Sequence, residues 1–117
     1  MLTNFPELTK QLSADIRELR VGQPDVMKAF SAMAMSATAG KALDAKTKEL
    51  IALAIGVAVR CDDCIAFHAK AAVEKGATRD EVMETLGMAV YMGAGPSVMY
   101  ASHAVAAFNQ FEQAKAG

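Results

Sequence analysis

Two cysteines and a histidine stand close together near the middle of the chain. Cys61, Cys64 and His68 are spaced three and four residues apart. At ~100° per residue, the three side chains fall within ~60° of one another on one face of a helix. Cys64 and His68 are i, i+4 neighbours, so the imidazole can take the thiol proton. The spacing therefore predicts a nucleophilic thiol at Cys64 with a general base at His68.

The second cysteine, Cys61, is expected where a helix begins. Free backbone N–H groups at a helix start favour a thiolate. A Cys-x-x-Cys pair can also close into a disulfide, so a sulfenate formed on one sulfur can be resolved by the other. Asp62 and Asp63 lie between the cysteines, and their charges disfavour a thiolate unless they face solvent or pair with Arg60. Asp62 is expected to cap the helix.

Other readings of the cysteines stay open. A zinc site would use Cys61, Cys64, His68 and a fourth ligand, either Glu49 or His103. A second ligand pair at knuckle spacing is missing from the sequence, which disfavours zinc. Chance burial of small apolar cysteines and a static disulfide are the remaining alternatives, and the second is rare in cytoplasmic proteins. We expect no metal and no cofactor, and we expect His103 to be a packed or surface residue.

Glu49 lies twelve residues before Cys61, at the start of an apolar run. Alone, it is a solvated charge ahead of a buried helix. Together, however, Glu49, Cys61, Cys64 and His68 form the pattern Glu-x11-Cys-x2-Cys-x3-His. This pattern resembles the signature of the alkylhydroperoxidase D-like (AhpD-like) branch of the carboxymuconolactone decarboxylase family. The resemblance extends over about residues 43–93.

The resemblance implies a role for each of the four residues. The position of Cys64 is the attacking thiol of the peroxidase branch, with Cys61 as its partner. The positions of His68 and Glu49 form a proton relay, and the substrate is a hydroperoxide. A lipoyl-bearing protein or another dithiol reductant returns the disulfide to the dithiol, and some members serve a peroxiredoxin. Family members assemble as trimers or hexamers.

Two other functions are alternatives to the peroxidase hypothesis. One is a lyase of the carboxymuconolactone decarboxylase type, which needs an acid–base group and an anion site rather than two thiols. The other is a non-catalytic, oligomeric redox or zinc-binding module.

Helix signals are abundant and strand signals nearly absent, so the fold class is all-α. Capping residues, helical spacing of apolar residues and terminal glycines predict a single compact domain over residues 1–117 with about six helices. These are expected over residues 4–22, 24–40, 44–59, 63–75, 78–93 and 96–111. Residues 93–97 are expected to form a corner between the last two helices. The resemblance implies the same all-helical fold.

The uncharged run Leu50–Val59 predicts a helix that is buried nearly all round. Gly56 inside this run indicates close approach by a neighbouring helix.

Composition limits the partners. The chain is 53% hydrophobic, with a net charge of −1 at pH 7, and a domain of 117 residues cannot bury all of its apolar surface. We therefore expect a homo-oligomer. The charge gives no basic face for nucleic acid. Glycines and a proline interrupt the longest uncharged stretch, so no membrane helix is expected. The N-terminus lacks the pattern of a signal peptide, and we expect a cytoplasmic protein.

Overall fold

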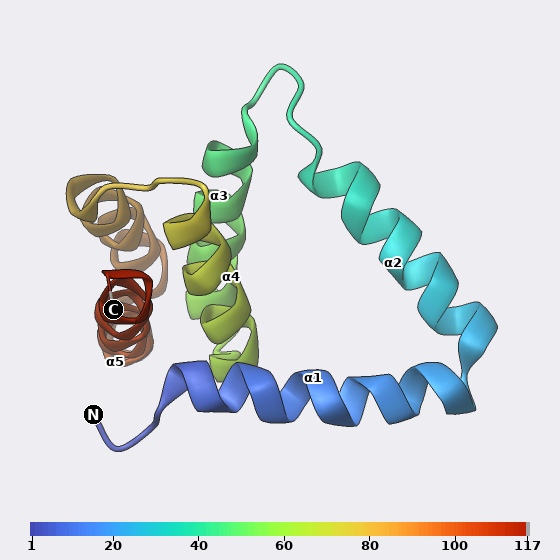
Figure 1. Cartoon of the computed structure of the whole chain (residues 1–117). Coiled ribbons are helices and arrows are strands. Elements are labelled where there is room, and N and C mark those ends of the chain that lie inside the picture. The colour runs from blue at the N-terminus through green and yellow to red at the C-terminus, as the bar shows by residue number, and fades with distance from the viewer. Residues whose placement is uncertain (117) are drawn as a thin grey trace.

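The first and third helices begin at the capping residues that the sequence indicates. We analysed a computed structural model, which describes residues 1–116. Asn4 accepts a hydrogen bond from the Glu7 N–H at 3.0 Å, and Asp44 accepts one from the Thr47 N–H at 2.7 Å. These bonds satisfy donors that have no partner inside the helix. The helices are α1 (Phe5–Gly22), α2 (Pro24–Thr38), α3 (Ala45–Ala58), α4 (Asp62–Glu74) and α5 (Arg79–Ala116) (Figure 1).

The start of α5 is a capping box. The Glu81 N–H donates to Thr78 Oγ1 at 3.1 Å, and the Thr78 N–H donates to Glu81 Oε1 at 2.8 Å, so each side chain satisfies the other residue's backbone donor. Lys46 of α3 pairs with Glu81 at 2.8 Å. The hydrogen bond from the Lys46 ammonium, and to a smaller extent the one from the Thr78 N–H, lowers the pKa of the Glu81 carboxyl group. The box thus also connects α3 to α5.

The all-α fold is confirmed, but the expected count of about six helices is replaced by five. The last two expected helices are joined in α5, which is kinked at Ala94, where the backbone takes a φ of 53°. Pro96 follows the kink and starts its second half, because proline is favoured in the first turn of a helix. The predicted corner at residues 93–97 is therefore a kink within one element.

One hydrophobic core holds α3, α4 and α5 together, and the first half of α1 closes it. Small residues such as Ala66, Ala69 and Ala104 are fully buried there, so the helices approach closely. Phe5 is fully buried at the start of α1, and its N–H donates to Gln110 Oε1 at 2.7 Å. Phe5 thus anchors the start of the chain against α5.

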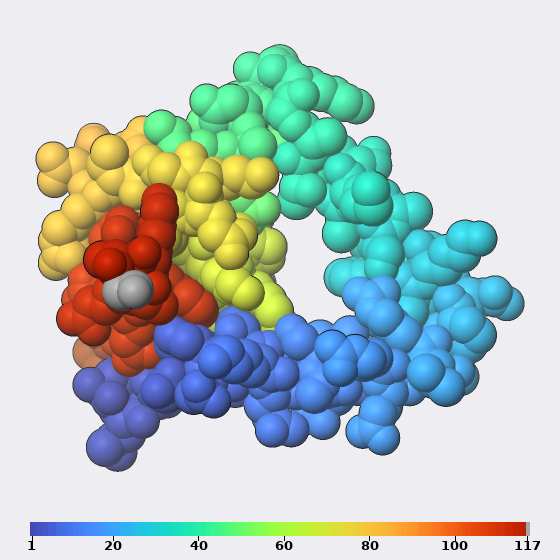
Figure 2. Space-filling model, in the orientation of Figure 1, coloured from blue at the N-terminus to red at the C-terminus, as the bar shows by residue number. Residues whose placement is uncertain are grey.

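The rest of α1 and all of α2 extend away from this body. Figure 1 shows α1 and α2 as two sides of an open triangle, and Figure 2 shows an opening between α2 and the body. Within residues 1–116, α2 contacts only α1 and α3, and none of its residues is buried. Val26, Phe30 and Met33 lie one helical turn apart and are more than half exposed. The apolar face of α2 therefore has no cover within residues 1–116.

The prediction that α3 is buried nearly all round was wrong. Its inner face carries Leu53, Gly56 and Val57, which are buried. Its outer face carries Ile51, Ile55 and Val59, and the last two are 55% and 64% exposed. We call these three residues the α3 stripe. The charge-free sequence does mark an apolar helix, but hydrophobicity alone does not tell whether the cover comes from the same chain.

Among residues 1–116, no helix combines the length and apolar character needed to cross a membrane.

We predict that Phe5→Ala destabilises the fold by about 3–5 kcal/mol, because it removes a fully buried aromatic side chain and leaves a cavity. Urea unfolding followed by circular dichroism measures the change. Leu2→Ala is the matched control, since Leu2 is fully exposed a few residues earlier, and it should change the free energy of unfolding by less than about 0.5 kcal/mol. Equal effects of the two substitutions would contradict the anchoring role of Phe5.

Candidate functional site

The site is built on the tight turn between α3 and α4. Arg60 adopts a left-handed conformation with a φ of 59°. The Cys61 N–H donates to the Gly56 carbonyl at 3.0 Å, and the Val59 N–H donates to the Ile55 carbonyl at 2.8 Å. A left-handed residue with a long backward hydrogen bond is the usual way for a helix to end. The turn reverses the chain over a few residues and brings Cys61 back beside α3.

Cys61 is the residue that caps α4, and the prediction that Asp62 would do so was wrong. The Cys61 Sγ accepts a hydrogen bond from the Cys64 N–H at 3.1 Å, while Asp62 is the first residue of the helix. The tight turn places Cys61 in the extended conformation that a cap requires. The predicted position of Cys61 at the edge of the helix is thus confirmed.

Cys61 and Cys64 form a disulfide in this structure, with their Cα atoms 5.2 Å apart. Gly56 lies directly opposite. A Cβ atom at Gly56 would lie 3.4 Å from the Cβ of Cys64 and 3.5 Å from the backbone nitrogen of Ile65. The predicted close approach at Gly56 is therefore confirmed, and it is the two-cysteine turn of α4 that approaches.

Glu49 and His68 meet across α3 and α4. His68 Nδ1 lies 2.8 Å from Glu49 Oε2, and Glu49 is only 7% exposed. A buried carboxylate needs a hydrogen-bond donor, so Nδ1–H donates to it. This contact leaves Nε2 as the nitrogen that can exchange protons with other groups. The expected contact of Glu49 with His68 is present, and Glu49 is not the solvated charge that it would be alone.

Cys64 and His68 both line one small cavity. It measures about 210 Å³ and is lined by Ala52, Ile55, Gly56, Val59, Cys64 and His68. Four of these six residues are apolar or glycine residues of α3 or its end, including two residues of the α3 stripe. Cys64 and His68 supply the only groups able to act in acid–base or redox chemistry among its lining residues. The cavity is therefore mainly apolar, and its reactive groups are Cys64 and His68.

A second histidine–carboxylate pair lies on the other side of the turn. His103 Nδ1 of α5 lies 2.7 Å from Asp62 Oδ1. Asp62 thus pairs with His103 rather than with Arg60 or a backbone donor, while Asp63 is exposed. The sequence did not indicate this pair, since its members are 41 residues apart and a lone histidine on an apolar helix carries no signal of its partner. The expectation of His103 as a merely packed or surface residue was therefore incomplete.

The proposed zinc ligands are not gathered into one group. Glu49 contacts His68, whereas His103 contacts Asp62. Within residues 1–116, no cluster of three or more His, Cys, Asp or Glu side chains has an arrangement that could hold a metal ion.

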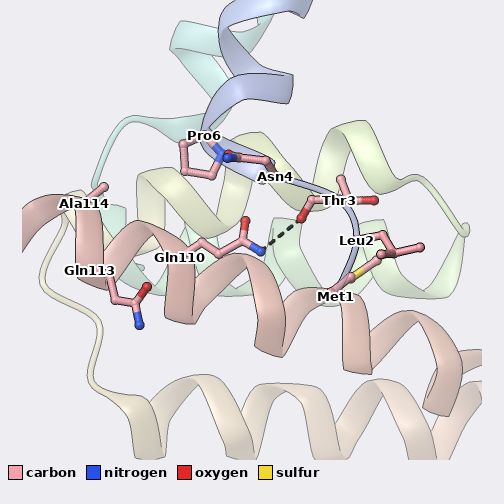
Figure 3. Close-up of a pocket in the computed structure, with 8 residues that line it drawn as sticks. All are labelled: Met1, Leu2, Thr3, Asn4, Pro6, Gln110, Gln113 and Ala114. Carbon is pink, nitrogen blue, oxygen red and sulfur yellow. Dashed lines mark hydrogen bonds between the residues drawn. The ribbon is translucent and has the colours of Figure 1, made fainter.

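A larger hollow lies away from the cysteines. It measures about 520 Å³, and the N-terminal segment and the end of α5 form its walls (Figure 3). The Gln110 amide donates to the Thr3 carbonyl at 3.0 Å across it. Its lining residues are Met1, Leu2, Thr3, Asn4, Pro6, Gln110, Gln113 and Ala114, none of which is a nucleophilic thiol, a histidine or a charged side chain. We therefore place the candidate site at the smaller cavity.

The Glu49–His68 contact should set the reactivity of Cys64. Glu49→Gln keeps a side chain of the same shape but removes the charge that stabilises a protonated His68. We predict that alkylation of Cys64 at pH 7 slows by about tenfold or more. The rate is measured with iodoacetamide in a Cys61→Ser background, so that Cys64 is the only thiol.

Glu74→Gln is the control for this experiment, because Glu74 is exposed at the other end of α4. It should leave the alkylation rate unchanged. If Glu49→Gln alkylates as fast as this control, His68 does not depend on Glu49.

Comparisons with known proteins identify the family of the chain. The sequence profile described as "Carboxymuconolactone decarboxylase family" matches residues 24–107. An uncharacterised protein of Cupriavidus necator is 41% identical over 107 residues, which cover 92% of this chain and 91% of the relative. Uncharacterised protein 4 in the cox locus of Paracoccus denitrificans is 34% identical over 102 residues, with coverage of 87% and 92%.

Two solved structures share the fold. Apo-lpg0406, a carboxymuconolactone decarboxylase family protein from Legionella pneumophila, is 50% identical, with a TM-score of 0.90 over 92% of this chain and 96% of its own. A family protein from Thermotoga maritima, for which a part in an antioxidative response has been suggested, is 26% identical, with a TM-score of 0.83 over 92% of each chain. The match of the profile over most of the chain, together with these relatives, shows that this protein belongs to the carboxymuconolactone decarboxylase family.

Proposed function

We propose that the protein is a thiol-dependent oxidoreductase that reduces hydroperoxides through a Cys61–Cys64 dithiol–disulfide cycle. The observation that carries the proposal is the cavity that both Cys64 and His68 line, with buried Glu49 2.8 Å from Nδ1 of the same imidazole. A nucleophile, a base and a group that orients the base form the usual arrangement of an activated nucleophile. Cys61 supplies the resolving thiol, since it is close enough to Cys64 to form a disulfide.

The cycle starts with the dithiol. His68 Nε2 takes the proton of the Cys64 thiol, and the thiolate attacks the outer oxygen of the hydroperoxide. The O–O bond breaks as the S–O bond forms, and the proton on His68 goes to the departing alkoxide, which leaves as an alcohol. The sulfur of Cys64 has then been oxidised to a sulfenic acid by two electrons.

The resolving step restores the disulfide. The sulfur of Cys61 attacks the sulfur of Cys64, and the S–O bond breaks as the S–S bond forms. The hydroxyl group leaves as water, with the proton of the Cys61 thiol. An external dithiol then reduces the disulfide by exchange and is itself oxidised to a disulfide. A lipoyl-bearing protein is the class of dithiol reductant that we propose, whereas a peroxiredoxin would be a partner that receives electrons from the dithiol. A cycle of this kind suits the reducing conditions of the cytoplasm.

The lining of the cavity bears on the choice of substrate. Ala52, Ile55 and Val59 offer apolar contacts, so the free energy of binding favours a hydroperoxide with a hydrocarbon group over hydrogen peroxide. A decarboxylase acting on a lactone acid would need a cationic group to hold the carboxylate. The residues that line this cavity include no lysine or arginine, so no observation favours that alternative.

We also propose that the protein works as a homo-oligomer. The uncovered face of α2, the α3 stripe and the exposed Met88, Tyr91 and Met92 of α5 leave large apolar side chains in solvent. Patches of this kind usually mark subunit interfaces. Ile55 and Val59 of the α3 stripe also line the cavity, so a neighbouring copy there would screen the thiol from water. Light scattering of the purified protein distinguishes a trimer or hexamer from a monomer.

The peroxidase proposal predicts a specific dependence on each cysteine. With cumene hydroperoxide and a dithiol reductant such as dihydrolipoamide, Cys64→Ser should lower peroxide consumption to the uncatalysed rate, because it removes the nucleophile. When the reductant is omitted, Cys61→Ser should consume about one equivalent of peroxide and accumulate a sulfenic acid instead of a disulfide, because the chain has no second thiol to resolve it. The assay measures peroxide loss over time.

Ser102→Ala serves as the control, since Ser102 is exposed and bonds only to a backbone carbonyl of its own helix. It should match the wild-type rate. Peroxide consumption by Cys64→Ser at the wild-type rate would contradict the proposed function.

A further inference from the structure

The pair formed by Asp62 and His103 stands apart from the relay of Glu49 and His68. It joins the first residue of α4 to the second half of α5. Both histidines present Nδ1 to a carboxylate, but the carboxylate of the second pair belongs to Asp62, the residue that directly follows Cys61. The proposed cycle gives this second pair no part.

Asp62 stands where a negative charge acts directly on Cys61. It follows Cys61 in the chain and begins α4, while Asp63 follows as the second helical residue. The free N–H groups of this turn favour an anion, and the Cys61 Sγ accepts one of them, that of Cys64. A thiolate on Cys61 therefore competes with two neighbouring carboxylates for the same positive potential.

His103 changes this balance for one of the two carboxylates. Its side chain is 27% exposed and that of Asp62 is 39% exposed, so the pair is shielded from water better than a freely exposed ion pair. Tyr100, one turn earlier on α5, holds the imidazole from the side, with ring centroids 5.0 Å apart. A protonated His103 would cancel the charge of Asp62, and a neutral His103 would still direct that carboxylate toward α5.

Other charged groups around this turn are engaged elsewhere or exposed. Glu49 of α3 contacts His68, and Lys46 of α3 pairs with Glu81 of α5. Arg60 and Asp63 are exposed. From α1, Arg17 and Arg20 line a separate hollow with Phe67, further along α4.

We propose that His103 is a positioning residue which offsets the charge of Asp62 and thereby sustains the thiolate of Cys61. The inference deepens the proposed function and rests on it, because Cys61 must act as a nucleophile when it resolves the sulfenic acid. It also bears on reduction, since Cys61 must leave as a thiolate if the reductant attacks Cys64, and must be accessible if the reductant attacks Cys61. The thiolate of Cys61 can be measured without any peroxide.

The test is the pH profile of iodoacetamide alkylation in a Cys64→Ser background, where Cys61 is the only thiol. His103→Gln should slow alkylation at pH 7 by about threefold to tenfold and displace the profile to higher pH, because Asp62 then keeps its full charge. Asp62→Asn should restore the rate in the His103→Gln protein. Asp62→Asn alone should alkylate at least as fast as the Cys64→Ser parent, and it tests the inference even if His103→Gln does not fold.

Asp63→Asn is the matched control, because Asp63 carries the same charge one residue later but is exposed and makes no contact with His103. Its effect should be the same whether or not His103→Gln is also present, whereas the effects of Asp62→Asn and His103→Gln should be non-additive. The inference is overturned if His103→Gln leaves the profile unchanged, or if it slows alkylation equally in proteins with and without the Asp62→Asn substitution. If the wild-type protein has no peroxidase activity, the proposed function is refuted. The alkylation rates of Cys61 are measured without peroxide and would still test the role of His103.

Discussion

The close packing of α3 against α4 at Gly56 is the constraint on which the rest of the site depends. Because Gly56 has no side chain, the turn that carries Cys61 and Cys64 can lie directly against α3. The same face of α3 carries Glu49 two turns earlier, and this register brings the Glu49 carboxylate to His68 at 2.8 Å. A side chain larger than that of alanine at Gly56 would separate the two helices and move the thiol and the base of α4 away from the carboxylate of α3.

Much of this arrangement could be predicted from the sequence, because its parts are local. The spacing of Cys61, Cys64 and His68 places them on one helix face, and the caps at Asn4 and Asp44 depend on residues only three positions away. Local signals were misleading at Asp62. Either Cys61 or Asp62 could have capped α4, and the decision depended on the left-handed turn at Arg60.

Two other features that the sequence did not reveal depend on contacts beyond the local sequence. His103 reaches Asp62 from 41 residues away, and nothing in its neighbourhood indicates this partner. The α3 stripe is similar, since the run Leu50–Val59 has the hydrophobicity of a core helix whether its outer face meets its own chain or another copy. The structure separates the two cases by leaving Ile55 and Val59 more than half exposed.

The central claim is that Cys61 and Cys64 exchange two electrons with a hydroperoxide. The most direct measurement is a single turnover: the reduced protein, freed of reductant, receives one equivalent of cumene hydroperoxide, and its thiols and intact mass are determined after quenching. Both thiols should disappear, the mass should fall by two hydrogens and one equivalent of alcohol should form. Recovery of both free thiols together with unconsumed hydroperoxide would contradict the proposed cycle.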